Sequence, residues 1–560
     1  MSRKILNRKW LLAIVPAVML ITAGFVARPA AGDEYFEISK NLDIFGKLYR
    51  EVHSNYVDDI EPTDFMRTGI DAMLKSLDPY TNYISAAEIE DYRFMSTGQY
   101  GGIGAMVGKR DNKVLVTEPY ENSPATRAGL RAGDVIIQID NQKVNGDNGK
   151  NIDVRDLLRG QPKSKVKLIV EREGLAEPLT LELERDDIKI LNVPYWGMID
   201  NEIGYISLTG FTADAANEVK AAFEDLKAKN PGMKALMLDL RGNPGGLLFE
   251  AIDISNLFVP KDELIVETRG KMEGSLRSYS ARNNPLDTQI PLAVLVNRRS
   301  ASASEIVSGV IQDLDRGVIV GQRSYGKGLV QTTRPLSYNS QIKITTAKYY
   351  TPSGRCIQAI DYSSRNEDGS VGKIPDSLQK EFRTHNGRKV YDGGGVAPDV
   401  EVALPELHTV SKELIRQNMI FDYATRFRTK HETIATAREF KITDEIYSDF
   451  VAFCKSKAFT FETKTEKEFD AFKKIATEEH YDEELSADMK ALESKLKKEK
   501  EEDLVNFRSE ISNLLRNEIV MRYYYRRGEI DASFDMDPDV LEAIKVLKDN
   551  ERMNKILAKG

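Results

Sequence analysis

Serines on a short turn and a lysine further along the chain have the residue types and spacing for nucleophilic chemistry. Ser300, Ser302 and Ser304 alternate with alanines between a short apolar run and a helical pattern. A hydroxyl on such a strand-to-helix turn is exposed, and the positive end of the helix dipole lies beneath it. Lys327 follows between two glycines. This order indicates a serine nucleophile, which needs a base within hydrogen-bond reach.

Histidine is the usual base for a serine, but the histidines of this chain are poorly placed. They are His53, His385, His408, His431 and His480. Most of them lie in the helical segments predicted at the two ends of the chain. None belongs to a recognisable triad motif, and the sequence contains no Gly-x-Ser-x-Gly elbow. A serine–histidine hydrolase of another substrate class is therefore a disfavoured alternative.

A lysine can act as the base if its amine is kept neutral. The free amine has a pKa of about 10.4, and burial in an apolar pocket can lower it to roughly 7, which costs on the order of 4 kcal/mol. Lys327 lies near Tyr325 and Leu329, just after an apolar strand, and this setting is compatible with a buried amine. A Ser-x-x-Lys pair also occurs at Ser377 and Lys380, but its polar context indicates a chance match.

The elements that must position these groups alternate between strand and helix from about residue 192 to 405. The apolar runs 292–296 and 318–320 have the pattern of buried strands, and the helix between them carries Glu305 in its first turn, where it suits the dipole. Upstream, a buried run leads directly into the sequence RGNPGG at 241–246. Glycines at such a strand end often bring backbone amides to a ligand, although a plain tight turn is equally consistent. The alternation predicts an α/β layer architecture.

Short alternating runs with glycine and proline turns replace this pattern at residues 100–187. Strands are predicted at 114–116, 135–139, 166–170 and 179–183. The order of these elements, and above all the segment SPATRAGLRAGDVIIQIDNQKV, resembles a PDZ domain. Such domains add a peptide to a sheet edge and bind its terminal carboxylate through backbone amides. By that resemblance the carboxylate loop comprises Gly101, Gly102, Ile103 and Gly104. A dinucleotide site is excluded because Val107 stands where a third glycine is required.

The first 32 residues have the layout of a secretory signal. Basic residues precede an apolar run at 10–26, and Ala30-Ala31-Gly32 follow it just before two acidic residues. Removal of this segment after export is favoured over its retention as an inner-membrane anchor, because the run is short for a span. Both outcomes predict that the body of the protein lies outside the cytoplasm, in the periplasm or cell envelope.

The remaining composition excludes several classes of protein. A net charge of −8 gives no general case for nucleic-acid binding, which also disfavours that role for the basic segment 522–527 in the charged helical tail. Cys356 and Cys454 are the two cysteines, and they do not make a metal cluster or a disulfide framework, while a single bridge between them stays open. We therefore expect no metal and no cofactor. For the tail, dimerisation or contact with an adaptor protein is predicted.

Several motifs together resemble the carboxyl-terminal processing (tail-specific) peptidases, a serine–lysine family. They are SLDPY, LDLRGNPGG, SASASEI with GKGLVQ downstream, and YYTPSGRCIQ through GVAPDV, which, with the PDZ-like segment, cover most of residues 40–405. The resemblance implies Ser302 as the nucleophile, Lys327 as the general base and Gln331 as the residue that helps to orient the lysine. The implied oxyanion donors are the amide of Ala303 and one from Gly245 or Gly246. Ser300 is then expected as a turn residue and Ser304 as a helix cap.

The resemblance also implies the organisation of the chain and its function. The implied parts are a signal or anchor (1–32), a helical cap (33–99), a PDZ-like domain (100–187), an α/β, crotonase-like peptidase core (188–405) and a helical C-terminal domain (406–560). The implied enzyme is an exported serine endopeptidase that cuts proteins near apolar C-terminal ends, which its PDZ domain binds while gating activity. Arg131 is a candidate for that coupling, beside its default interpretation as a solvated arginine. A non-catalytic PDZ scaffold or chaperone is the alternative, disfavoured by the intact serine, lysine and glutamine.

Overall fold

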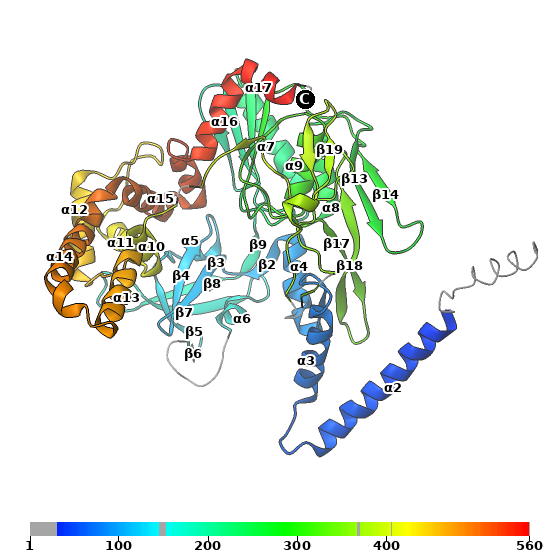
Figure 1. The fold of residues 1–560 in the computed structure, drawn as a ribbon, viewed down its shortest axis with the longest axis horizontal. Helices are drawn as coiled ribbons and strands as arrows, with labels where there is room; N and C mark the ends of the chain where they lie inside the picture. Colours follow the sequence, from blue (N-terminus) through cyan, green and yellow to red (C-terminus); the bar gives the residue numbers. More distant parts are fainter. Residues whose placement is uncertain (1–30, 145–152, 364, 367–369, 405, 559–560) are drawn as a thin grey trace, which may run out of the picture. The chain divides into compact units, whose positions relative to one another are not determined.

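The computed structural model describes residues 31–144, 153–363, 365–366, 370–404 and 406–558. By its contacts the chain divides into two compact units, residues 1–83 and 84–560. The first unit contains the helices α2 (Ala31–Asn55) and α3 (Pro62–Lys75), which are labelled in Figure 1. The apolar run at 10–26 lies outside the described residues. Within the described part, no helix is long and apolar enough to cross a membrane.

The second unit is built around a six-stranded sheet. In sheet order, its strands are β10 (Tyr195–Met198), β11 (Ile203–Ser207), β12 (Ala235–Asp239), β15 (Leu292–Val296), β16 (Val318–Gly321) and β21 (Val400–Glu401). The first pair is antiparallel and all the others are parallel. Every residue of β11, β12 and β15 is buried, as expected for parallel strands covered on both faces. The predicted α/β architecture is confirmed.

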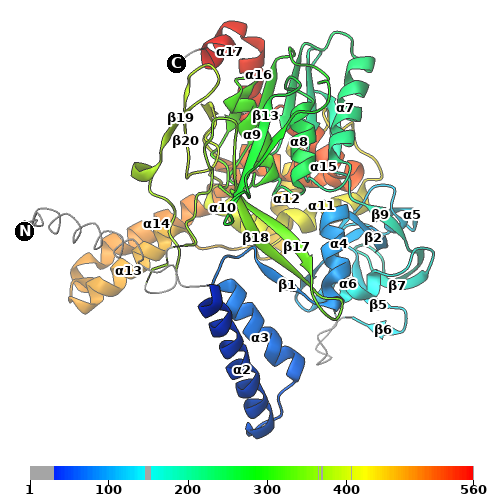
Figure 2. The ribbon, with the colours of Figure 1, turned by 90° about the vertical axis from the view of Figure 1, so that its right-hand side faces the viewer.

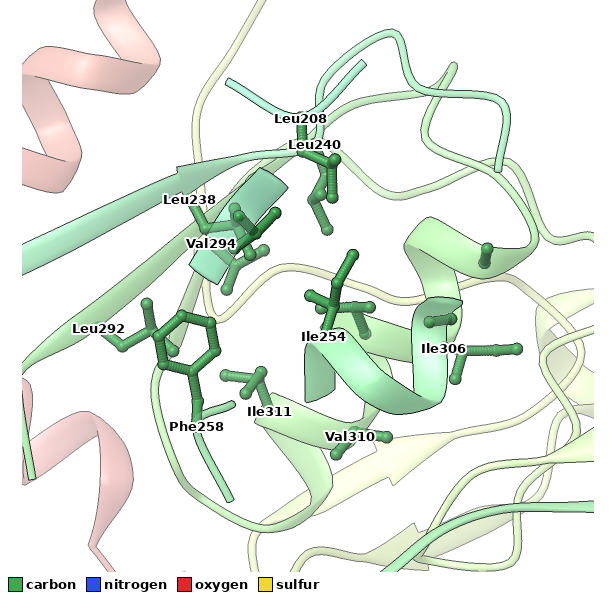
Figure 3. Packing of buried hydrophobic residues seen from close by; sticks show 14 of the residues in the cluster. Leu208, Leu238, Leu240, Ile254, Phe258, Leu292, Val294, Ile306, Val310 and Ile311 are labelled. Carbon is green, nitrogen blue, oxygen red and sulfur yellow. The ribbon is translucent and has the colours of Figure 1, made fainter. Parts of the chain in front are cut away.

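Three helices cover one face of this sheet. They are α7 (Ala215–Lys229), α8 (Leu248–Asn256) and α9 (Ala303–Asp313). Figure 3 shows Ile254 of α8 and Ile311 of α9 packed close to Leu292 and Val294 of the sheet. Successive residues of a strand point to opposite faces, so Ala293, between Leu292 and Val294, belongs to the other face. Helix α9, which begins immediately after Ser302, is therefore anchored by its apolar side to the core.

The last two helices of the chain cover the opposite face. One buried cluster contains apolar residues of α16 (Pro538–Lys548) and α17 (Asn550–Leu557) together with Met237, Ala293 and Leu295 of the sheet. In Figures 1 and 2 both helices lie beside the core at the end of the chain. The end of the helical tail is thus a structural layer of the core built on this sheet, and removing the tail would expose this sheet face.

The segment that follows Lys327 belongs to a second sheet. Strand β17 (Leu329–Pro335) pairs antiparallel with β18 (Gln341–Tyr350), which also pairs with β13 (Leu264–Gly270), and β13 pairs with β14 (Arg277–Ser280). The register of β17 and β18 shifts between Val330 and Gln331. Such a bulge re-aims side chains and is frequent next to active sites.

The region at 100–187 is an antiparallel sheet, as its alternating pattern predicts. Its strands are β3 (Ala105–Arg110), β4 (Lys113–Pro119), β5 (Val135–Ile139), β6 (Gln142–Lys143), β7 (Lys165–Glu171) and β8 (Leu179–Glu184). Two short helices, α5 (Pro124–Arg127) and α6 (Val154–Leu158), complete it. Leu130, Leu158 and the inward-facing strand residues form its core. The separate strands β2 (Gln99–Gly102) and β9 (Asp186–Lys189) pair with each other where the chain enters and leaves this domain.

The helical tail has its own core besides its layer on the sheet. Its helices are α10 (Thr409–Arg416), α11 (Met419–Lys430), α12 (Asp444–Ser456), α13 (Lys464–Glu478), α14 (Asp482–Asn506) and α15 (Arg508–Ser533). Phe450, Ile519 and Cys454 are among its buried residues. Cys454 and Cys356 are both free thiols, and burial raises the pKa of Cys454 to about 12. Burial raises the pKa of the Cys356 thiol as well.

Candidate active site

Ser302 lies on the turn that joins β15 to α9, as predicted. It is the N-cap residue of α9, and its backbone has φ 57° and ψ −112°, a combination that residues other than glycine rarely adopt. Such conformations persist only where the surroundings fix them, and they concentrate at functional sites. The turn thus holds Ser302 in a strained conformation directly at a helix N-terminus.

The other two serines of the turn are buried and bonded to the backbone. Ser300 Oγ donates to the carbonyl of Leu240 at 2.8 Å, which confirms its expected role as a turn residue. The expectation that Ser304 caps the helix is wrong: Ser302 takes the cap position, and Ser304 Oγ donates to the carbonyl of Asn243 at 3.0 Å. The reason is that the helix begins at Ala303, two residues earlier than a cap at Ser304 requires. Of the three serines, Ser302 is the one that lines a cavity.

That cavity has a volume of about 420 Å³ and brings most of the predicted site residues together. Those residues are Ser302, Ala303, Lys327, Gln331, Gly245 and Gly246. Apolar side chains form much of the remaining wall, and they are Met95, Leu247, Leu248, Ile306, Leu329 and Val330. Segments more than 80 residues apart in the sequence thus form one hollow with a polar and an apolar side.

A buried carboxylate joins the serine turn to the lysine loop. Glu305 accepts hydrogen bonds from the backbone amides of Ser302 at 2.8 Å, Gly326 at 2.7 Å and Lys327 at 2.9 Å, and from the hydroxyl of Ser324. Burial raises the pKa of Glu305, while these four donors oppose the rise. The sequence showed Glu305 only as a first-turn acid. Its spacing of three residues from Ser302 is that of a capping box, the one signal that was available for its role.

The two glycines beside Lys327 are required by close packing. A Cβ on Gly326, whose φ is +90°, would lie 2.4 Å from the Cβ of Ala359. A Cβ on Gly328 would lie 2.8 Å from the amide nitrogen of Gln358, whose side chain accepts the Gly328 amide at 2.7 Å. The backbone of the loop that carries Lys327 therefore packs directly against residues 358–359.

Gln331 lies where the register of β17 against β18 shifts, at a bulge whose extra residue, Thr346, is on β18. In a regular strand alternate residues would face opposite sides, yet Leu329, Val330 and Gln331 all line this hollow. Gln331 Nε2 donates to Oγ1 of Thr345 at 3.2 Å on the paired strand β18. Gln331 and Lys327 therefore share the cavity, and the orienting role implied by the family resemblance stays a prediction.

The glycine turn after β12 lies against the serine turn. Gly245 has φ +94°, and a Cβ on it would lie 2.8 Å from the amide nitrogen of Ala303 and 2.6 Å from the carbonyl oxygen of Ala301. Only glycine allows the two turns to approach this closely. The amide of Gly245 itself donates to Oδ1 of Asn243 at 2.9 Å. The backbone of this turn thus packs directly against the serine turn, and its part in binding a ligand stays a prediction.

Two residues that the sequence did not single out support these turns. Asn243 is fully buried, and its carbonyl accepts the amide of Ala301 at 3.0 Å and the hydroxyl of Ser304. Tyr349 is also buried, which raises the pKa of its phenol, and its hydroxyl donates to the carbonyl of Ser302 at 3.2 Å. The sequence carried no signal for either contact, because both join segments far apart in the chain.

The histidines and the Ser-x-x-Lys pair lie elsewhere. All five histidines are among the described residues, and none of them lines the cavity of Ser302. The Ser-x-x-Lys pair, Ser377 and Lys380, is exposed and also outside the cavity. Lys327 and Lys343 both line the cavity of Ser302, and Lys327 is the one whose backbone amide shares the acceptor Glu305 with the amide of Ser302.

The predicted peptide-binding and gating residues lie outside this cavity. Gly101 and Gly102 belong to β2 and pair with β9, Ile103 is a core residue, and Gly104 (φ +74°) packs against Ser123. Their carboxylate-binding role stays a prediction. Arg131 lines a separate cavity of about 210 Å³ formed with α11 and α15 of the helical tail. Burial and the nearby guanidinium groups of Arg172 and Arg428 lower its pKa.

Family models match three successive segments of the chain. Residues 115–172 match a PDZ domain, residues 202–364 match peptidase family S41, and residues 410–547 match the probable PDZ-protease, C-terminal helical domain. The carboxy-terminal-processing protease of Bartonella bacilliformis is 39% identical over 323 residues, which cover 57% of this chain and 73% of that relative. This chain belongs to the carboxy-terminal processing proteases of peptidase family S41.

Other members of the family are similar over comparable lengths. The carboxy-terminal processing protease CtpA of Bacillus subtilis is 32% identical over 385 residues, covering 68% of this chain and 79% of that protein. Among solved structures, the photosystem II D1 C-terminal processing protease is 28% identical and has a TM-score of 0.35, covering 64% of this chain and 92% of its own. This peptidase is therefore a serine-type enzyme of the family, with a PDZ domain and a helical C-terminal domain.

Proposed function

We propose that this peptidase cuts peptide bonds near the C-termini of its substrates with a Ser302–Lys327 dyad. Ser302 Oγ attacks the scissile carbonyl carbon, and the neutral amine of Lys327 takes the hydroxyl proton. The lysine then returns that proton to the leaving amine, and the same base activates the water that hydrolyses the acyl-enzyme. The observation that carries the proposal is the single cavity shared by both residues, with Glu305 bonded to the backbone amide of each.

The oxyanion of each tetrahedral intermediate would be stabilised by backbone amides. Ala303 supplies one donor at the N-terminus of α9, where the helix dipole adds to it. For the second donor we favour Gly246 over Gly245, because the amide of Gly245 already donates to the side chain of Asn243. Preorganised donors of this kind contribute roughly 2.7–4 kcal/mol each to transition-state stabilisation.

The apolar wall of the cavity supports a preference for apolar side chains next to the cut bond. Leu248, Ile306 and Leu329 line the hollow beside Ser302, where a polar substrate side chain would lose its hydration without a partner. Capture of apolar C-terminal ends by the PDZ domain fits the same substrate class.

Export of the enzyme is part of this proposal. It rests on the basic, apolar and small-residue order of the first 32 residues. N-terminal sequencing of the protein from the cell envelope would distinguish removal, which gives a chain starting near Asp33, from an intact anchor.

The dyad is tested with an unstructured peptide that ends in apolar residues. Wild-type protein should cleave it, whereas Ser302→Ala and Lys327→Ala should each lower kcat by at least 1000-fold with the protein still folded. The rate should also rise with pH, because the lysine must lose its proton to act as a base. Cleavage that survives either substitution, or a rate that is highest near pH 5, would refute the dyad. Binding without cleavage by the wild type would instead support the scaffold alternative.

A further inference from the structure

A carboxylate at the start of α16 contacts both loops that carry the proposed catalytic groups. Asp539 Oδ2 accepts a bond from Arg241 Nη1 at 2.9 Å, and Asp539 Oδ1 accepts one from Gln322 Nε2 at 2.9 Å. Arg241 begins the glycine turn that ends at Gly246. Gln322 follows β16 and begins the loop that leads to Lys327. Each oxygen of this one carboxylate therefore holds the first residue of one loop.

The neighbouring Asp537 fixes the position of this carboxylate. Asp537 is the N-cap of α16, and its Oδ1 accepts the amides of Asp539 at 3.0 Å and Val540 at 3.2 Å. The same oxygen accepts a bond from Arg241 Nη1 at 2.8 Å. Pro538 occupies the first helical position, where its restricted φ suits the start of a helix. The geometry of the helix start thus determines where the guanidinium lies.

Arg241 connects the start of α16 to the glycine turn. Its Nε and Nη2 atoms bond to Asp239, the last residue of β12, at 2.7–3.0 Å. The side chains of Arg241, Asp239 and Asp539 are 18%, 8% and 8% exposed, so solvent and salt screen their charges little. Charge-assisted bonds of this kind are strong and directional. Loss of one carboxylate would leave a buried guanidinium partly uncompensated and free to shift.

The lysine loop is therefore held at both ends, by Asp539 at Gln322 and by Glu305 at the amides of Gly326 and Lys327. The glycine turn is held by Asp539 through Arg241, on the side of the helical tail. We propose that Asp539, assisted by Asp537, is a positioning residue for catalysis. The end of the helical C-terminal domain thereby sets the geometry of the active site. This inference rests on the dyad and oxyanion turn proposed above.

The test compares Asp539→Ala and Asp539→Asn in the full-length protein with the apolar-ended peptide. We expect Asp539→Ala to lower kcat by at least tenfold and to change KM by less than twofold, because the side chains that line the cavity are untouched. Asp539→Asn should lie between the alanine variant and the wild type. Its amide oxygen can still accept the bond from Arg241, while its NH2 group faces the donor of Gln322.

Two control variants on the same helix separate positioning from stability. Glu542 accepts bonds from Lys545 and Arg552, so Glu542→Gln removes a charge from α16 without touching either loop. Val546 is buried against the sheet, so Val546→Ala lowers Tm through packing alone. Below their Tm both controls should keep the kcat of the wild type. A Val546→Ala variant with the same loss of Tm as Asp539→Ala and the same loss of kcat would overturn the proposal.

A combined variant tests the route of the effect. If Asp539 acts through Arg241 and Gln322, then adding Asp539→Ala to a variant with both Arg241→Ala and Gln322→Ala should lower kcat little further. Multiplied losses would show that the carboxylate acts elsewhere and would refute the inference. Ser302→Ala measured in parallel keeps the two proposals distinct. If it abolishes cleavage while Asp539→Ala has the kcat of the wild type, the dyad stands and the positioning role fails.

Discussion

Replacement of Glu305 by glutamine tests the link between the serine turn and the lysine loop. The carboxylate accepts four bonds, from the amides of Ser302, Gly326 and Lys327 and from Ser324 Oγ. A glutamine offers one acceptor oxygen, and its NH2 group would face the other donors. About two buried donors then lose their partners, at roughly 1–3 kcal/mol each, so the free energy of unfolding should fall by about 2–6 kcal/mol.

Activity should fall further than stability alone explains. Ser302 and Lys327 would no longer share an acceptor, and a displacement of about 1 Å between reacting groups costs on the order of 100-fold in rate. Urea unfolding and peptide cleavage measure the two effects separately. Asp287→Asn is the matched control, because Asp287 also accepts two backbone amides, from Gln289 and Ile290 at 2.8 Å, but lies outside the cavity. It should lose stability and keep its kcat.

The pH dependence of stability gives a second measurement on Glu305. Burial raises its pKa above the ordinary 4.5, so the native state binds its proton more tightly than the unfolded state. Proton binding at this carboxyl therefore adds a stabilisation that is fully present below about pH 4.5 and is lost as the pH rises through the raised native pKa, and the glutamine variant lacks this pH dependence. A Glu305→Gln variant with an unchanged urea midpoint and a kcat within twofold of the wild type would refute this reasoning.

Two further substitutions probe the backbone around Ser302. Gly245→Ala should lower kcat by at least 100-fold, because its Cβ would lie 2.6 Å from the carbonyl oxygen of Ala301. Gly232→Ala, where a Cβ has open space, should be silent in the same cleavage assay, and an active Gly245→Ala enzyme would contradict the close approach of the two turns. Tyr349→Phe removes the bond to the Ser302 carbonyl, worth about 1 kcal/mol, and should lower the urea midpoint slightly and kcat less than tenfold. A loss of 100-fold would assign the hydroxyl a larger role.

The sequence predicted those parts of this enzyme that depend on local pattern. Strand β15 has the predicted bounds, because a short apolar run between a proline and polar residues has few other interpretations. The cavity that gathers Ser302, Lys327 and Gly245 follows from motifs and the family resemblance. The cap assigned to Ser304 failed because helix starts are uncertain by about one or two residues, and the cap is Ser302.

The sequence could not predict contacts between residues that are far apart in the chain and are related by no helix or strand period. Glu305 and Gly326 are 21 positions apart, and Arg241 and Asp539 are 298 apart. Charged residues are common on helix surfaces, so each of these acids has the pattern of an ordinary solvated side chain. Their burial follows only when the sheet is closed on both faces. The sequence also could not predict that α16 and α17 cover the sheet, because their apolar faces are equally consistent with packing inside a helical tail.

The backbone strain at Ser302 leads to a prediction about stability. A residue with a Cβ in this conformation costs about 1–3 kcal/mol, whereas glycine adopts it without strain. Ser302→Gly and Ser302→Ala both remove the nucleophile, but only glycine removes the Cβ. Glycine also loses more conformational freedom on folding, by roughly 0.5–1 kcal/mol. The difference favours the glycine variant by up to about 2 kcal/mol, so its urea midpoint should exceed that of the alanine variant. The carbonyl of Ser302 accepts the amides of Glu305 and Ile306, and its own amide donates to Glu305, so both variants keep the contacts that fix the turn. An alanine variant as stable as the glycine variant would show that the turn is relaxed, and that its geometry reflects local preference rather than strain held for catalysis.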